Sequence, residues 1–252
     1  MMLVCLHGWG GSKESFEDLR RALAGSSITI LTPDLPGFGE EPDPQMPWTP
    51  DDYADWVVDW VGRNAPQAND RTLWLLGHSY GGRIAIKLAA RACDPKNTRP
   101  AFPIDRLFLC AASGIRHPRH IKRIIGLTLA KAGKFFLSIP GLNVLAPVGK
   151  KLLYKLVRVH DYEKASPVMR QTLINSSAED LRSVLPCITV PTAIFWGTDD
   201  GMNPLSDGKH MAAQIPHAEL HTYEGVRHRV HRDKAKEIAE TIIAAIKAQT
   251  SA

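Results

Sequence analysis

The sequence lacks any long hydrophobic run. Hydrophobic residues make up 44% of its 252 residues, but no uninterrupted apolar stretch approaches the ~20 residues that a membrane-spanning helix needs. The first residues carry neither a basic leader nor a small-residue cleavage site, so they do not resemble a secretory signal. We therefore expect no transmembrane segment and a cytoplasmic location.

Cysteine is scarce and scattered. No two of the four cysteines are spaced as Cys-x-x-Cys. Cys5 and Cys110 lie in apolar, strand-like segments. A reduced thiol in such a segment behaves as a small hydrophobic side chain. This spacing argues against a zinc site and against a disulfide framework. No group of histidines and carboxylates has metal-ligand spacing either, so the sequence implies no metal.

Glycine and proline are also limited. Their 19 and 18 residues amount to roughly 15% of the chain, well below the level that marks low-complexity sequence. Charged residues make up 23%, which is ordinary for a globular domain. A single domain of this length can bury a large core.

Short apolar segments alternate with helical patterns along most of the chain. The strand candidates are residues 2–6, 28–33, 72–76, 107–111, 193–196 and 219–223, and the helix candidates are residues 13–24, 50–62, 79–92, 205–214 and 234–247. Several strand candidates are continuously apolar, as expected when both faces of a strand are buried. The pattern predicts an α/β fold with a mostly parallel sheet flanked by helices.

The alternation stops after residue 113. Residues 114–187 have a helical pattern without a strand and contain turn signals that divide the segment into pieces. Such an insertion after a strand of a parallel sheet would cover the carboxyl edge of the sheet, where ligands bind. We predict that residues 1–113 and 188–252 form the core and that residues 114–187 form a helical cap in the same domain. The alternative is a pair of helices that only thicken the core.

The strongest sequence signal is the segment GHSYG at residues 77–81. It follows one expected strand and opens the next expected helix, and a Gly-x-Ser-x-Gly in that context is typical of a nucleophile elbow. The tight turn needs glycine at 77 and 81, because a Cβ there would collide with the neighbouring strand and helix. A glycine-rich connection without chemistry is the alternative. We interpret Ser79 as the candidate nucleophile.

A second glycine-rich segment, HGWGG at residues 7–11, follows the first expected strand. A tetrahedral intermediate needs two backbone N–H donors aimed at its developing oxyanion. One donor would be Tyr80, the residue after the nucleophile, and the other would be Trp9 in this early loop. We expect His7 to shape the loop through a hydrogen bond.

Carboxylates and histidines follow the last two expected strands. Asp199 and Asp200 come after residues 193–196, and His228 and His231 come after residues 219–223. The chain order is therefore serine, aspartate, histidine, which is one of the known orders of a catalytic triad.

Together with the segment DLPGFG at residues 34–39, these motifs make the chain resemble the α/β-hydrolase superfamily over nearly its whole length. The HGWG loop and the compact cap are loosely similar to the carboxylesterase branch that includes the pimeloyl-carrier-protein methyl ester esterases. Compared with the family, the chain starts at the strand that is normally third. The leading antiparallel strands would then be missing and a sheet edge would be exposed.

The resemblance also assigns roles. Ser79 would be the nucleophile and His228 the general base, with an aspartate orienting the imidazole. The family pattern Gly-x-x-Asp-x-x-x-Pro selects Asp200 over Asp199, and the Gly-x-x-His spacing selects His228 over His231. Arg227 departs from the family, which usually has glycine before the histidine.

The implied function is that of a serine hydrolase that cleaves carboxylic esters of small molecules through an acyl-enzyme on Ser79, without a cofactor. The same triad serves thioesterases, acyltransferases and other α/β-hydrolase chemistries, and sequence does not choose among them because selectivity depends on pocket shape. A non-catalytic ligand-binding protein that keeps the pocket is an alternative from another class.

Positive charge is concentrated in the expected cap. Residues 114–164 contain eleven basic and two acidic residues, a net charge of +9, whereas the whole chain carries +5 and the remainder therefore −4. The excess could be a solvated cap surface, a docking surface for an acidic acyl carrier protein, or a contact with anionic lipid. No nucleic-acid-binding module is recognisable, so nucleic acid is not an expected partner.

Overall fold

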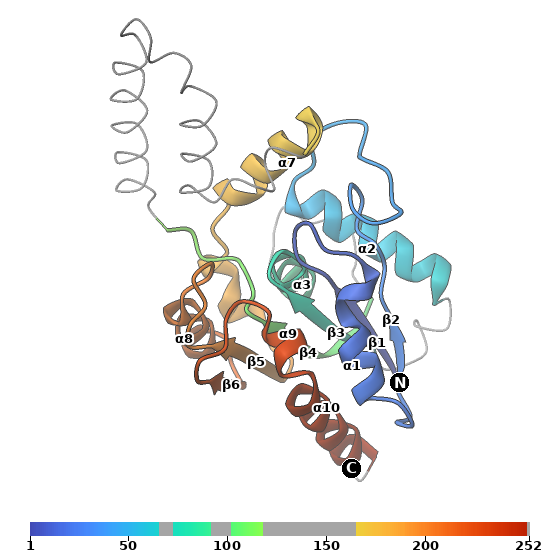
Figure 1. Ribbon diagram of the computed structural model, residues 1–252, viewed down its shortest axis with the longest axis vertical. Coiled ribbons are helices and arrows are strands. Elements are labelled where there is room, and N and C mark those ends of the chain that lie inside the picture. Colours follow the sequence, from blue (N-terminus) through green and yellow to red (C-terminus); the bar gives the residue numbers. More distant parts are fainter. Residues whose placement is uncertain (66–72, 92–101, 118–164, 251–252) are drawn as a thin grey trace, which may run out of the picture.

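The computed structural model describes residues 1–65, 73–91, 102–117 and 165–250, and it has one parallel sheet at its centre (Figure 1). The six strands are β1 (Met2–Leu6), β2 (Thr29–Leu31), β3 (Leu73–His78), β4 (Ile104–Cys110), β5 (Thr192–Gly197) and β6 (Ala218–Tyr223). Their order in the sheet is β2-β1-β3-β4-β5-β6, and all neighbouring pairs are parallel. This confirms the α/β fold with a parallel sheet.

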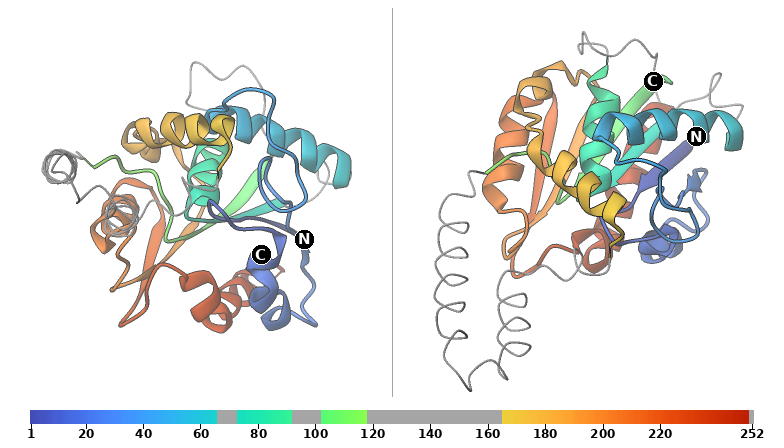
Figure 2. Two further views of the ribbon diagram at one scale, coloured as in Figure 1. Left: turned by 45° about the horizontal axis from the view of Figure 1, so that its top comes forward. Right: turned by 90° about the horizontal axis from the view of Figure 1, so that it is seen from above.

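Helices cover both faces of the sheet. The described helices are η1 (Lys13–Phe16), α1 (Glu17–Ala22), α2 (Pro50–Asn64), α3 (Tyr80–Ala89), α7 (Pro167–Ala178), η5 (Arg182–Cys187), α8 (Leu205–Gln214), α9 (Val230–Asp233) and α10 (Ala235–Thr250). Helices α1 and α10 pack together on one face, whereas α2 and α3 pack together on the other (Figure 2). The five helix candidates of the core are present, and one of them is divided: residues 13–24 form η1 and α1. The last candidate corresponds to α10, and the short helix α9 precedes it.

The central strands are buried because helices cover them from both sides. Every residue of β1, β3 and β5 is buried, including the large side chains of Trp74 and Trp196. Cys5 and Cys110 are fully buried in strands, and burial raises the pKa of both thiols. These thiols therefore contribute to the core as small apolar groups. Strand β2 has only three residues and forms one edge of the sheet, and β6 forms the other.

Much of the expected cap, residues 118–164, lies outside the described residues. The described remainder of residues 114–187 contains α7 and η5 and no strand. Of the basic residues that we counted in the expected cap, only Arg116 is described. None of the described helices is long and apolar enough to cross a membrane.

Candidate active site

The turn between β3 and α3 holds Ser79 in an unusual backbone conformation. Its φ of 50° and ψ of −111° lie outside the regions favoured by residues with a Cβ. The Ser79 carbonyl oxygen accepts hydrogen bonds from the backbone N–H and the hydroxyl of Ser113, at 2.9 Å and 3.1 Å. Such a conformation is worth about 1–3 kcal/mol of strain, and the bonds from Ser113 help the fold to maintain it.

Two glycines allow this turn to form. A Cβ on Gly77 would lie 2.5 Å from the carbonyl oxygen of Gly81, and a Cβ on Gly81 would lie 2.0 Å from the carbonyl oxygen of Leu6 in β1. Both distances are too short for real contacts. The predicted need for glycine at these two positions is therefore explained by the close approach of β3, α3 and β1.

The structure brings three side chains from distant parts of the sequence into one hydrogen-bonded chain. The Ser79 hydroxyl lies 2.9 Å from Nε2 of His228, and Nδ1 of the same imidazole lies 2.7 Å from Oδ2 of Asp200. Ser79 comes from the turn after β3, whereas Asp200 and His228 come from the loops after β5 and β6. All three loops leave the carboxyl edge of the sheet, so the parallel topology accounts for their meeting.

Asp200 is buried and accepts several hydrogen bonds, whereas Asp199 is exposed. The Asp200 side chain is fully buried, and its Oδ1 accepts hydrogen bonds from the backbone N–H groups of Met202 and Asn203 at 2.8 Å and 3.0 Å. The exposed Asp199 carboxylate instead accepts a bond from the Thr198 hydroxyl. Of the two aspartates, only Asp200 is hydrogen-bonded to His228.

The loop after β1 lies against the nucleophile turn. Gly8 is so close that an added Cβ would lie 3.2 Å from the Cβ of Ser79. The Trp9 ring packs edge-on against the Tyr80 ring, with centroids 5.2 Å apart. Tyr80 is the first residue of α3, so its backbone N–H has no intrahelical acceptor. As expected, His7 shapes this loop: its Nε2 accepts a bond from the backbone N–H of Leu35, and its Nδ1 lies 2.8 Å from the Gly8 carbonyl oxygen.

Two further histidines form a buried layer behind His228. His78 stacks on His231 with centroids 3.7 Å apart, and its Nε2 lies 3.0 Å from the carbonyl oxygen of His228. Burial lowers the pKa of His78 to about 3 and also lowers the pKa of His231 well below its usual value. Both imidazoles are therefore neutral near pH 7, and the bond shows that His78 donates to the His228 carbonyl. His231 is stacked on His78, not bonded to Ser79.

Helix α7 contributes contacts that the sequence motifs did not reveal. The Tyr80 hydroxyl lies 3.0 Å from the Ser176 hydroxyl, and Thr172 accepts a bond from the backbone N–H of Trp48. Both α7 side chains are buried. They come from a segment with a weak sequence pattern, and no motif could have identified them.

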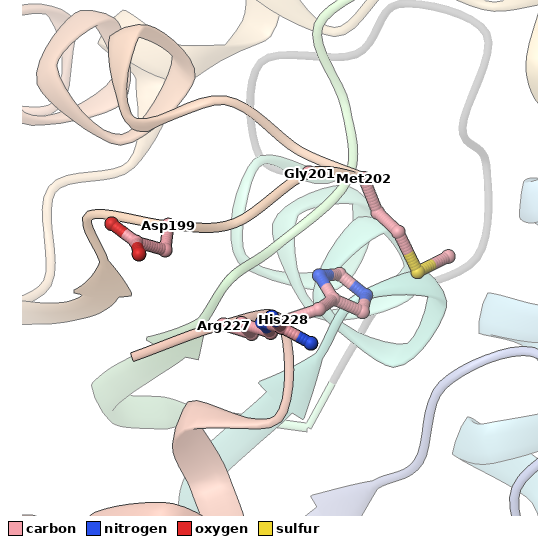
Figure 3. Close-up of a pocket in the computed structure, with 5 residues that line it drawn as sticks. All are labelled: Asp199, Gly201, Met202, Arg227 and His228. Atoms are coloured by element: carbon pink, nitrogen blue, oxygen red, sulfur yellow. The ribbon is translucent and has the colours of Figure 1, made fainter. Parts of the chain in front are cut away.

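A pocket of about 460 Å³ opens beside the imidazole. Its lining residues, drawn in Figure 3, are Asp199, Gly201, Met202, Arg227 and His228. The figure shows the Met202 thioether beside the imidazole and the Asp199 carboxylate pointing away from it. In the described part of the chain, no group of three or more histidines, cysteines or carboxylates could hold a metal ion.

Comparisons with known proteins agree on the family. A sequence model of the alpha/beta hydrolase family matches residues 3–241. The pimeloyl-[acyl-carrier protein] methyl ester esterase of Neisseria meningitidis is 27% identical over 232 residues, which cover 88% of this chain and 84% of the relative. Lipase 1 of Psychrobacter immobilis is 25% identical over 238 residues, covering 90% of this chain and 70% of the relative. These sequences support the predicted resemblance to the esterase branch.

Solved structures show the same fold. The esterase EaEST from Exiguobacterium antarcticum superposes with a TM-score of 0.69 at 22% sequence identity. The match covers 98% of this chain and 92% of that one.

Proposed function

Because the chain belongs to the alpha/beta hydrolase family, we propose that it is a serine hydrolase that cleaves carboxylic esters through an acyl-enzyme on Ser79. Membership of the family supports hydrolase activity. We propose the serine mechanism and the ester substrate in addition. The observation that carries it is the hydrogen-bonded chain from the Ser79 hydroxyl through His228 to Asp200.

In the proposed first step, Ser79 Oγ attacks the ester carbonyl carbon while Nε2 of His228 takes the hydroxyl proton. Asp200 holds the imidazole in the tautomer that leaves Nε2 free to accept this proton, and it stabilises the imidazolium that forms. The bond between the carbonyl carbon and the alcohol oxygen then breaks, and His228 gives the proton to the leaving alcohol. Water, deprotonated by His228, attacks the acyl-enzyme and releases the carboxylic acid, and Ser79 recovers its proton.

The negative oxygen of each tetrahedral intermediate would be bound by the backbone N–H groups of Tyr80 and Trp9. Tyr80 follows Ser79 directly as the first residue of α3, and Trp9 lies on the loop after β1, whose neighbouring Gly8 approaches Ser79 closely. The N-terminal position of Tyr80 on α3 adds the positive end of the helix dipole. Preorganised donors of this kind are worth about 2.7–4 kcal/mol each in transition-state stabilisation.

The relatives favour an acyl ester as the substrate, since their names describe a lipase and a methyl ester esterase that acts on a carrier-protein-bound acyl group. An acidic acyl carrier protein or another anionic surface is therefore a candidate partner for the basic residues between 114 and 164. Nearly all of these basic residues lie outside the described residues.

Fluorophosphonate labelling with peptide mapping tests the proposal, run beside p-nitrophenyl esters of increasing acyl length. We expect the label on Ser79, turnover of at least the short esters, and loss of both in Ser79→Ala with the fold retained. Turnover that survives in Ser79→Ala would refute the assignment. A folded protein that neither labels nor turns over any ester, but binds an ester saturably, would favour the non-catalytic binding protein instead.

A further inference from the structure

The pocket beside His228 contains an arginine with an unengaged side chain. Arg227 is exposed and lines the pocket, and its guanidinium has no hydrogen bond or ion pair with the described residues. The only carboxylate among the lining residues is that of Asp199, and it points away from the imidazole (Figure 3). The neighbouring Asp200 carboxylate is already occupied by His228 and two backbone amides.

The chemistry of the site indicates which part of a substrate would reach this pocket. His228 Nε2 must protonate the alcohol oxygen as the alcohol leaves, so that oxygen has to lie within hydrogen-bond distance of the imidazole. A substituent on the alcohol would therefore lie beside the imidazole, which is also the group that joins the nucleophile to this pocket. The acyl carbon, in contrast, stays on Ser79.

We propose that this pocket binds an anionic group, a carboxylate or a phosphate, on the alcohol part of the ester, with Arg227 as the residue that determines this specificity. The proposal rests on the proposed function, since it assumes that Ser79 and His228 act on an ester. A guanidinium presents a planar set of donors that matches the two oxygens of a carboxylate or phosphate. Met202, which is 61% exposed, supplies an apolar wall beside it.

A matched pair of substrates tests the proposal. The carboxylate is present in 4-acetoxybenzoate and is replaced by a neutral group of similar size in 4-acetoxybenzamide; the 3-isomers repeat the comparison at another distance. The two leaving groups differ in intrinsic reactivity, so kcat/KM for the carboxylate ester is first divided by kcat/KM for the amide ester in each protein. The result for the wild type is then divided by the result for Arg227→Gln. We expect a value of roughly two to five, typical of one solvent-exposed ion pair, which falls towards one as salt is raised.

Arg229→Gln is the matched control. Arg229 is an exposed arginine on the same loop that does not line the pocket, so its loss changes the net charge equally. We expect Arg229→Gln to keep the wild-type ratio. A ratio unchanged in Arg227→Gln, or lowered equally by both variants, would overturn the proposal in favour of a solvated arginine or of long-range steering.

Binding separates a failure of this proposal from a failure of the proposed function. The proposed function fails if the folded wild type neither takes the fluorophosphonate label on Ser79 nor hydrolyses any ester of the panel, and calorimetry with 4-hydroxybenzoate and 4-hydroxybenzamide then still tests the pocket. Tighter binding of the carboxylate by the wild type than by Arg227→Gln, with no such difference for the amide, would support the anionic pocket. Equal binding by the two proteins would overturn it.

Discussion

The two carboxylate oxygens of Asp200 have different partners, and these partners determine how the side-chain amide would be oriented in Asp200→Asn. Oδ1 accepts two backbone N–H bonds, from Met202 and Asn203, and only Oδ2 faces His228. In Asp200→Asn, the amide oxygen must stay with the two N–H donors, so the NH₂ group faces Nδ1 of His228. The imidazole then carries its proton on Nε2 and cannot accept one from Ser79.

We therefore expect Asp200→Asn to lower kcat for p-nitrophenyl acetate by about 10⁴-fold with the fold intact, as a change of tautomer does in other triads. The control is Asp105→Asn, which removes an exposed carboxylate near the amino end of β4, away from the site. Near-wild-type turnover in Asp200→Asn would show that this carboxylate does not orient the base.

At this scale, the sequence predicts the candidates but not their surroundings. Ser79, Asp200 and His228 could be selected because each stands in a motif with a fixed relation to a strand end. The stack of His78 on His231 could not be predicted, because it depends on how the short helix α9, which contains His231, packs against the end of β3. The catalytic roles of the three candidates remain predictions.

At the scale of elements, helix α7 is fixed to the core by a charged contact with α3. Lys87 of α3 is nearly buried and bonds to Glu179, at the end of α7, and to Asp51 of α2, each at 2.8 Å. Arg83, one turn earlier, donates to the carbonyl oxygen of Glu179. Burial alone would lower the pKa of Lys87, but the bonds to its two carboxylate partners outweigh burial and raise it. The cation therefore joins three helices.

Lys87→Met should destabilise the protein by about 1–3 kcal/mol, which urea unfolding measures. Methionine has similar volume and helix propensity, so the main loss is the cation between two carboxylates. Breaking a fully buried pair costs about 3–5 kcal/mol, and we expect less here because Asp51 and Glu179 are partly exposed. Lys236→Met, at an exposed position on α10, should stay within about 0.5 kcal/mol of wild type. Equal effects of the two substitutions would contradict the bridging role.

The elements themselves were mostly predictable, whereas their connections were not. The continuously apolar strands and the helix over residues 205–214 follow directly from the sequence pattern. The edge strand β2 is shorter than residues 28–33, because only three of its residues pair with β1. The anchoring of α7 depends on single polar side chains such as Ser176 and Glu179, which carry no periodic signal.

At the scale of the whole molecule, three histidines of the described segments are buried in the folded state: His7, His78 and His231. Burial lowers the pKa of each below its usual value. In the unfolded chain the same groups titrate near pH 6.5. Below that pH the unfolded state binds protons that the folded state does not, so the free energy of unfolding must fall as the pH is lowered.

Each fully neutral buried histidine should contribute a loss of about 1.4 kcal/mol per pH unit below pH 6.5. The described carboxylates with a perturbed pKa, Glu14 and Glu237, do not titrate in this window, because their pKa values are lowered from about 4.5. Urea unfolding at about pH 7.5, 6.5 and 5.5 should therefore show a loss of about 1 kcal/mol or less over the first step and a larger loss, roughly 2–3 kcal/mol, over the second. His231→Phe, which keeps a ring against His78 and Phe16, should reduce the loss over the second step by about 1 kcal/mol. The control is His217→Asn, at an exposed histidine, which should leave the pH-dependent loss of stability unchanged. If His231→Phe does not reduce that loss, His231 takes up its proton while the protein stays folded, and the prediction is wrong.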